Sequence, residues 1–368
     1  MKLRPRKLLF ASSGCSVHDH RFLTNAVSGG FDVVFMRFDG KGTEGEINNR
    51  PESVNRVNWI GDRQRLSQEN FEVFCEQFHA VVNSLKPDII HAGPLSSVAS
   101  VAVQISDIPV IAMSWAFDVL RDYDESAFGR RCVDLCMERA TAFVADCSTV
   151  KRKLEGLGSG QRPVVSLPWG IDLLEWAYVK PVQKSSNFRV LNLRSWEPGY
   201  RVHELVEAFA ENREHLGDSP VLVMAGGGSL ERELRLRAIS LGLENEVVWL
   251  GRIRESEVRK ELTACDVHVS TSPVDGTSVS LLHAMAIGRP SVVCDNASNR
   301  EWVTAEGNGW LFAPGNVPDL GHVLCESARD FGTRRLFGER SRKVVEKQAN
   351  WENNRRVVLA LYDDLISM

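Results

Sequence analysis

The chain has 368 residues, which is long enough for two domains. Of these residues 43% are apolar and 25% charged, the composition of a globular protein. Its formal net charge of −4 at pH 7 argues against a nucleic-acid partner. No apolar run approaches the ~20 residues that span a bilayer. The start, M-K-L-R-P-R-K before L-L-F, predicts a basic N-terminus and a first strand rather than a signal peptide. Those basic residues are compatible with peripheral association with a membrane surface.

The eight cysteines are scattered along the chain and form no C-x-x-C pair. Cys265 and Cys294 lie in apolar, strand-like contexts. We therefore expect free, buried thiols in a reducing cytoplasm, and no metal site.

The first half of the chain alternates strands and helices. Lys7–Ser12 predicts a buried strand, Arg21–Ser28 a helix and F-D-V-V-F-M-R-F a second strand, the pattern of a parallel sheet with crossover helices. Gly14, in the loop after the first strand, would let the backbone approach a ligand. His18 follows in that region, and His91 ends the strand P-D-I-I-H. His18 either contacts an acceptor or is a surface-loop histidine with no role.

The second half repeats the pattern. F-R-V-L-N-L-R-S-W-E-P-G-Y predicts a strand that runs into a loop, and P-V-L-V-M-A-G-G-G predicts a strand and a triple-glycine turn before a helix. Gly226 and Gly227 of that turn fit close approach to a ligand, although the glycines do not form G-x-G-x-x-G. E-V-V-W-L-G-R-I predicts the next strand.

The stretch 270–293, S-T-S-P-V-D-G-T-S-V-S-L-L-H-A-M-A-I-G-R-P-S-V-V, predicts a loop, a helix and a buried strand. Either Thr277 or Ser278 caps the helix, Gly288 lies past its end and Pro290 stops it. Free N–H groups at such a helix start, here 276–279, bind anions such as phosphate.

Two polar side chains flank this helix start. Asp275 precedes it and His283 comes eight residues later, which is about 12 Å of helix. That distance fits the span between the sugar and the ribose of a nucleotide-sugar, with its pyrophosphate on the helix start. The alternative is a surface aspartate in a turn and a histidine that packs on a helix.

The same stretch resembles the donor-binding signature of the retaining glycosyltransferases of family 4, which have the GT-B fold. That signature has two acidic residues before A-M-A-x-G-x-P-V-V, and this chain has Asp275 and His283 at those positions. D-G-T-S-V-S-L-L is typical of a sub-branch that usually has a glutamate where His283 stands. The resemblance implies an α/β protein with two Rossmann-like domains whose parallel sheets face a cleft.

The resemblance also implies roles for residues outside the signature. Arg194 matches an arginine that grips the donor pyrophosphate, and its planar fork suits phosphate. Tyr200 stands where the family has a second cation, a lysine, and Arg201 lies beside it. Arg252 and Ile253 follow a glycine at which the family holds the base, mainly by backbone.

In the first half, Trp115-Ala116-Phe117-Asp118 stands where the family has His-Gly-x-Asp, so only Asp118 matches. Trp115 either stacks on a sugar face or packs in the interior. With His18 and His91, these residues form the expected acceptor side.

The expected organisation is an acceptor-binding domain at residues 1–178, a donor-binding domain at 179–348 and a helix at 349–368 that crosses back to the first domain. We predict metal-independent transfer of a sugar in the cytoplasm, from a UDP- or GDP-sugar to a glycan, a lipid-linked sugar or a small molecule. The resemblance implies retention at the anomeric carbon. Asp275 and Arg194 are the predicted catalytic residues. The sugar and its phosphates would be held by Asp275 and by the four residues that follow it, Gly276, Thr277, Ser278 and Val279. A non-catalytic GT-B partner and a nucleotide-sugar epimerase are the alternatives.

Overall fold

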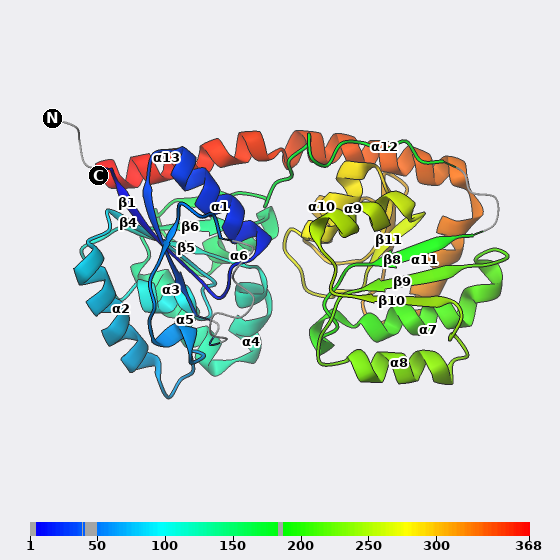
Figure 1. Ribbon diagram of the computed structural model, residues 1–368, viewed down its shortest axis with the longest axis horizontal. Coiled ribbons are helices and arrows are strands. Elements are labelled where there is room, and N and C mark those ends of the chain that lie inside the picture. The colour runs from blue at the N-terminus through cyan, green and yellow to red at the C-terminus, as the bar shows by residue number, and fades with distance from the viewer. Residues whose placement is uncertain (1–4, 39, 41–49, 183–186) are drawn as a thin grey trace. The chain divides into compact units, whose positions relative to one another are not determined.

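The computed structural model describes residues 5–38, 40, 50–182 and 187–368 (Figure 1). The chain forms two compact units. Unit 1 comprises the described residues up to Trp169 together with Glu352–Met368, and unit 2 comprises Gly170–Trp351. Residues 1–4, part of the basic segment that suggested membrane association, lie outside the described residues.

Unit 1 is built on a seven-stranded sheet in which every pair of neighbours is parallel, in the order β3-β2-β1-β4-β5-β6-β7. Its strands are short and almost wholly buried, because helices cover both faces of a parallel sheet. The strands are β1 (Lys7–Ser12), β2 (Asp32–Arg37), β3 (Asn55–Arg56), β4 (Ile89–Gly93), β5 (Val110–Met113), β6 (Ala142–Ala145) and β7 (Val164–Ser166).

The helices of unit 1 connect these strands in chain order. They are α1 (Val17–Ser28), α2 (Phe71–Leu85), α3 (Val98–Ala102), α4 (Tyr123–Glu125), α5 (Ala127–Arg139) and α6 (Ser148–Gly156). A capping box starts α1, in which Ser16 Oγ accepts a hydrogen bond from the Asp19 N–H and the Asp19 carboxylate accepts one from the Ser16 N–H.

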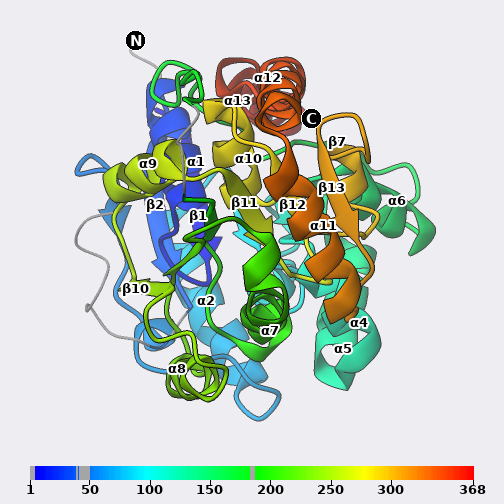
Figure 2. The same ribbon diagram turned by 90° about the vertical axis from the view of Figure 1, so that its right-hand side faces the viewer.

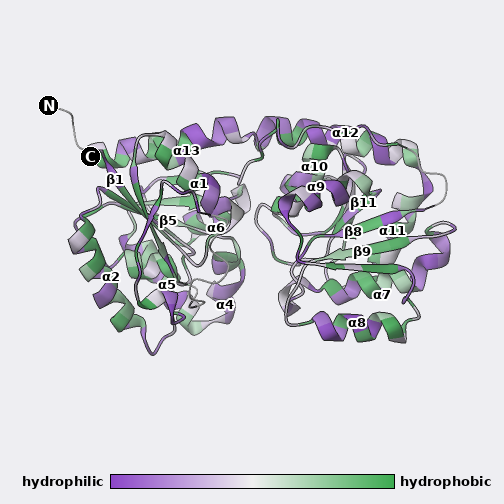
Figure 3. Cartoon of the chain, viewed as in Figure 1, coloured by the Kyte–Doolittle hydropathy of each residue, from purple (hydrophilic) through white to green (hydrophobic). Residues whose placement is uncertain are grey.

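Unit 2 has a second all-parallel sheet of six strands, in the order β10-β9-β8-β11-β12-β13. The strands are β8 (Arg189–Asn192), β9 (Val221–Ala225), β10 (Val247–Gly251), β11 (Val267–Ser270), β12 (Ser291–Cys294) and β13 (Gly309–Phe312). The helices are α7 (Val202–Asn212), α8 (Glu231–Ser240), α9 (Glu255–Ala264), α10 (Val279–Ile287), α11 (Val317–Arg329) and α12 (Phe331–Gln348). Figure 3 shows the strands as largely hydrophobic and the helices as mixed.

The helices of unit 2 form a layer on each face of its sheet. Helices α7, α8 and α11 bury their apolar side chains in one core cluster with the strands, and α9 and α10 do so in another. Figures 1 and 2 show α7 and α8 on one side of the strands and α9 and α10 on the other. This layering makes unit 2 a Rossmann-like domain, as unit 1 is. The predicted α/β fold class with two parallel-sheet domains is thus confirmed, whereas the cleft stays a prediction.

The last helix, α13 (Trp351–Ser367), packs on unit 1 from Glu352 onward. Tyr362 of this helix is fully buried, and its hydroxyl lies 2.7 Å from His91 Nδ1 of β4. Asn25 Nδ2 donates to the Arg355 carbonyl at 2.9 Å. The boundary between the units falls at Trp169, nine residues before the expected position, because the segment after it joins unit 2: the Ile171 N–H donates to the carbonyl of Ala349 at 2.6 Å.

Candidate functional site

The loop and helix predicted around 270–288 are present at the carboxyl edge of the unit 2 sheet. Strand β11 ends at Ser270 and α10 begins at Val279, with Ser278 as the N-cap whose Oγ accepts from the Leu281 N–H at 3.5 Å. Gly288 ends the helix with a φ of +84°, in the left-handed region that glycine favours. Because the helix starts only at Val279, helix accounts for about 6 Å of the span from Asp275 to His283, and the rest of that span is loop.

The two predicted catalytic residues contact each other. Arg194 lies two residues past the end of β8 and Asp275 lies in the loop after β11, and these strands are neighbours in the sheet. Nη2 of Arg194 forms an ion pair with Oδ2 of Asp275, and its Nε donates to Ser270 Oγ at 2.9 Å. The two side chains are 13% and 15% exposed, so the pair is shielded from most solvent screening.

Tyr200 also contacts Arg194. The guanidinium carbon lies 5.2 Å from the centre of the Tyr200 ring, a cation–π arrangement. Burial lowers the pKa of Arg194 to about 10, an effect that Tyr200 partly opposes, so the group keeps its charge at neutral pH. Tyr200 therefore supports the one arginine rather than supplying the second cation that the family has at this position.

Arg201 is engaged elsewhere. It takes a left-handed φ of +50° directly before α7, and its guanidinium forms an ion pair with Glu204 in the first turn of that helix. Glu204 is only 3% exposed, so Arg201 balances a buried carboxylate. Its use as a phosphate ligand would leave that carboxylate uncompensated.

The triple-glycine turn packs against the loop that carries Arg194. A Cβ at Gly226 would overlap the carbonyl oxygen of Arg194, and one at Gly228 would overlap the carbonyl oxygen of Trp196. The Gly226 N–H donates to the Gly251 carbonyl at 2.8 Å. Glycine is thus required here because two loops of the chain meet, and this contact accounts for the motif without a ligand.

The residues expected at the base lie on the next loop. Gly251 has a φ of +65°, Arg252 is exposed and Ile253 is half-buried. The Arg252 side chain lies over Gly227, where an added Cβ would be 3.1 Å from its Cγ and Nε. Arg252 thus brings a charged side chain to the same sheet edge as Arg194.

His283 sits in an aromatic stack that the sequence did not indicate. Its ring lies flat on Trp176, with 3.7 Å between ring centres and 11° between planes. The histidine is 6% exposed, and its Nε2 lies 3.9 Å from Oε1 of Glu255, the first residue of α9. No motif pointed to Trp176 or Glu255, because both reach His283 only through packing on α10.

In unit 1, two of the four expected acceptor-side residues, His18 and Trp115, lie at the carboxyl edge of the sheet, as does Gly14, which was expected to approach a ligand. Gly14 lies in the loop between β1 and α1, and His18 in the first turn of α1 stacks on Trp169 with 4.5 Å between ring centres. Burial, aided by the charge of Arg21, lowers the pKa of His18 to about 3, so the ring is neutral. Half-buried Trp115 follows β5, and its Nε1 finds no hydrogen-bond partner within the described residues.

The other two acceptor-side residues are structural in this fold. His91 is fully buried against Phe10, Phe22 and Tyr362, and burial lowers its pKa to about 3. Its placement in the core, forced by helix α13 packing over β4, gives no support to acceptor binding.

Asp118 is fully buried as well. Its carboxylate accepts hydrogen bonds from Ser114 Oγ at 2.6 Å and from the N–H groups of Leu95, Trp115 and Val119 at 2.8, 3.2 and 3.0 Å. It therefore holds the loop that presents Trp115.

Comparison with known proteins finds a family match in the second half of the chain. Residues 179–344 match the family model of the glycosyl transferases group 1. The matched residues make up most of unit 2. An uncharacterized glycosyltransferase of Methanocaldococcus jannaschii is 27% identical over 147 residues, which cover 40% of this chain and 38% of that protein. A GDP-mannose-dependent phosphatidylinositol monomannoside mannosyltransferase of Corynebacterium glutamicum is 23% identical over 203 residues, 50% of this chain and 52% of that enzyme.

The alignments with these curated relatives thus span about half of their length or less.

Solved structures match over nearly the whole chain. Sucrose-phosphate synthase from Thermosynechococcus elongatus superposes with a TM-score of 0.81 at 16% identity, covering 98% of this chain and 99% of that one. Anabaena HepE, solved with UDP and glucose, gives 0.77 at 18% identity, with 98% and 100% covered. At these identities the likeness shows the fold, which is GT-B.

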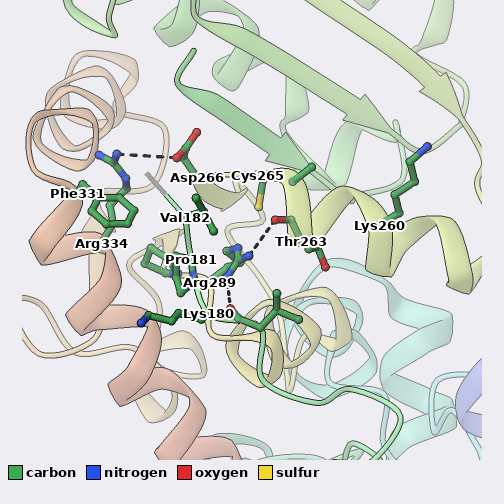
Figure 4. Close-up of a pocket in the computed structure, with 13 residues that line it drawn as sticks. Lys180, Pro181, Val182, Lys260, Thr263, Cys265, Asp266, Arg289, Phe331 and Arg334 are labelled. Carbon is green, nitrogen blue, oxygen red and sulfur yellow. Dashed lines mark hydrogen bonds and ion pairs between the residues drawn. The ribbon is translucent and has the colours of Figure 1, made fainter. Parts of the chain in front are cut away.

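A separate pocket of about 400 Å³ lies in unit 2, at the amino edge of its sheet (Figure 4). Asp266 and Pro290, which precede β11 and β12, belong to its wall. Arg289 in this wall donates to the carbonyls of Val179 and Thr263 at 2.8 and 2.9 Å. The pocket is therefore at the opposite edge from Arg194 and Asp275, and the charge of Arg289 is already matched by carbonyl groups of the chain.

Within the described ranges, no group of three or more His, Cys, Asp and Glu side chains could hold a metal ion. The eight cysteines are free, six of them buried. Among the helices of the described residues, none combines the length and the apolar character that a membrane span requires.

Proposed function

We propose that this protein is a retaining glycosyltransferase that moves a sugar from a nucleotide-sugar to an acceptor hydroxyl. The observation that carries the proposal is the Arg194–Asp275 pair at the carboxyl edge of a group 1 domain, beside the loop that leads into α10. Ligands of open parallel sheets bind at that edge. The pair offers one fixed cation for a phosphate and one carboxylate for a sugar.

Donor binding would use groups that are already oriented. The pyrophosphate would lie against the guanidinium of Arg194 and the N–H groups at the start of α10, where the helix dipole favours an anion. Arg252 would add a second positive charge from the neighbouring loop, and Ile253 would contact the base. Because burial keeps water away from Arg194, its charge acts at a low local dielectric.

The transfer step places negative charge on the leaving pyrophosphate and positive charge on the anomeric carbon. Arg194 and the α10 N–H groups would stabilise the first charge, and Asp275 would hold the sugar hydroxyls or offset the second. These charges do the work that a metal ion does elsewhere, so we propose metal-independent transfer. The acceptor would bind unit 1 near Gly14, His18 and Trp115, whose indole suits stacking on a sugar.

The donor is proposed to be a UDP- or GDP-sugar. HepE is named as a complex with UDP and glucose, and the Corynebacterium relative is named as GDP-mannose-dependent. Relatives named for O-antigen and colanic acid synthesis support a role in glycan assembly. We propose that this assembly takes place in the cytoplasm, at or near the inner face of a membrane. A non-catalytic partner is the second candidate, because Tyr200 and Arg201 supply no free cation beside Arg194.

Thermal unfolding against UDP-, GDP-, ADP- and TDP-sugars, without added metal, tests donor binding. A sugar nucleotide at a hundred times its dissociation constant adds about 2.7 kcal/mol of stability. The sugar nucleotides that raise the unfolding temperature are then incubated with the protein and acceptors. The products are analysed for transfer, for their anomeric configuration and for epimerised donor. Binding with no transfer and no epimer would favour the non-catalytic partner, and an epimerised donor would favour an epimerase.

A further inference from the structure

The site lacks a carboxylate at the position where the resemblance expects one for the ribose. His283 occupies it, with its ring held flat on Trp176 at 3.7 Å between ring centres. A neutral imidazole has one donor and one acceptor nitrogen, so it cannot accept hydrogen bonds from both hydroxyls of a ribose. A carboxylate can, because each of its oxygens accepts one.

Glu255 places a carboxylate next to this imidazole. Its Oε1 lies 3.9 Å from His283 Nε2, which is longer than a direct hydrogen bond. The Glu255 side chain is 39% exposed and that of His283 is 8% exposed. The carboxylate thus lies at the solvent-facing side of the buried ring, within the reach of one side chain from position 283.

Glu255 is the first residue of α9 and one of two acids in its first turn. The other acid of this turn, Glu257, accepts a hydrogen bond from the Arg254 N–H at 2.8 Å and so completes the start of the helix. Glu255 instead follows Arg252 and Ile253 by two residues along the chain. A nucleoside whose base contacts that loop would bring its ribose toward the first turn of α9.

We propose that Glu255 accepts the hydrogen bonds of the donor's ribose hydroxyls, with His283 and Trp176 as positioning residues. The family carries this carboxylate at the position of His283 on α10, whereas here Glu255 of α9 would supply it. The assignment rests on the proposed function, because it requires a nucleotide donor in this site.

The test measures dissociation constants by calorimetry for uridine and guanosine diphosphates and for their 2′-deoxy counterparts. The full-length wild type is compared with E255Q and with E257Q, which removes an equal charge two residues away. The wild type should prefer the ribonucleotide. The E255Q substitution should weaken ribonucleotide binding about tenfold, or 1.4 kcal/mol. Binding of the deoxynucleotide, which keeps its 3′ hydroxyl, should weaken less, so E255Q should lower the ribo/deoxy ratio. E257Q should lower thermal stability without changing that ratio.

A second variant separates a positioning role from a purely structural one. His283→Glu in the E255Q background should restore the ribo/deoxy ratio, because it returns a carboxylate to the same space. An E255Q ratio equal to that of the wild type would overturn the assignment of Glu255 and leave the proposed function standing. No binding of either diphosphate to the wild type would overturn the proposed function, and this assignment with it.

Discussion

The ion pair between Arg194 and Asp275 makes a prediction that runs against the usual effect of mutating a binding site. In the ligand-free chain the guanidinium already binds a carboxylate, so a phosphate must displace it. Asp275→Asn removes this competitor and leaves Arg194 available. We therefore expect the variant to bind a nucleoside diphosphate more tightly while it loses transfer activity.

The magnitude follows from the burial of the pair. Exposed ion pairs are worth about 0.2–1 kcal/mol, and removal of one partner of a fully buried pair costs about 3–5 kcal/mol. With side chains 13% and 15% exposed, this pair lies between these cases, at about 1–2 kcal/mol. That corresponds to a gain in diphosphate affinity of about 5–30-fold. Transfer should fall by about a hundredfold or more, the usual loss when one stabilising group is removed.

The assay is calorimetric titration with the diphosphate, together with transfer rates at saturating donor. Asp295→Asn is the matched control: it removes an equal charge after β12, from a pair with Arg300, and should change affinity less than about twofold. Without ligand, Asp275→Asn should also lower the free energy of unfolding, because Arg194 loses its partner. Weaker diphosphate binding in Asp275→Asn, or transfer at the wild-type rate, would refute the competition.

Three further predictions concern the scaffold. Gly226→Ala should lower the free energy of unfolding by about 3 kcal/mol or more, because its Cβ overlaps the backbone of the loop after β8. Gly156→Ala is the control: its Cβ meets open space at the end of α6, so it should be neutral or slightly stabilising. Equal unfolding midpoints of the two variants in urea would contradict this. Tyr362→Phe should lower stability by about 1–3 kcal/mol by leaving buried His91 Nδ1 without its partner, and an unchanged melting temperature would exclude that role. Burial raises the pKa of Asp118 to about 6, so the folded state holds this proton to higher pH than the unfolded state does. Relative to Asp118→Asn, the wild type should therefore gain stability as pH falls from about 6 to 3.8, by at most about 1.4 kcal/mol per pH unit, and a difference independent of pH would disprove it.

Local sequence signals were enough for the elements themselves. Strands of five or six apolar residues between helical segments predicted two parallel sheets, because a strand buried on both faces must be apolar throughout. The end of α10 followed from Gly288 and Pro290, and its start was limited to a cap at Thr277 or Ser278, of which the structure shows Ser278. The glycine turn was recognised too, but its cause was not, because the loop that it contacts is some 30 residues earlier in the chain.

The arrangement of the site was decided by tertiary structure. The sequence by itself determined that Arg194 ends one strand and that Asp275 follows another, and the resemblance assigned both to the donor. Only the order of the sheet, with β8 beside β11, makes them an ion pair. The partners of His283 depended on how α9 and the segment before β8 pack on α10, and the partner of His91 on where α13 docks. Such contacts join residues far apart in the chain, and no local propensity or spacing encodes them.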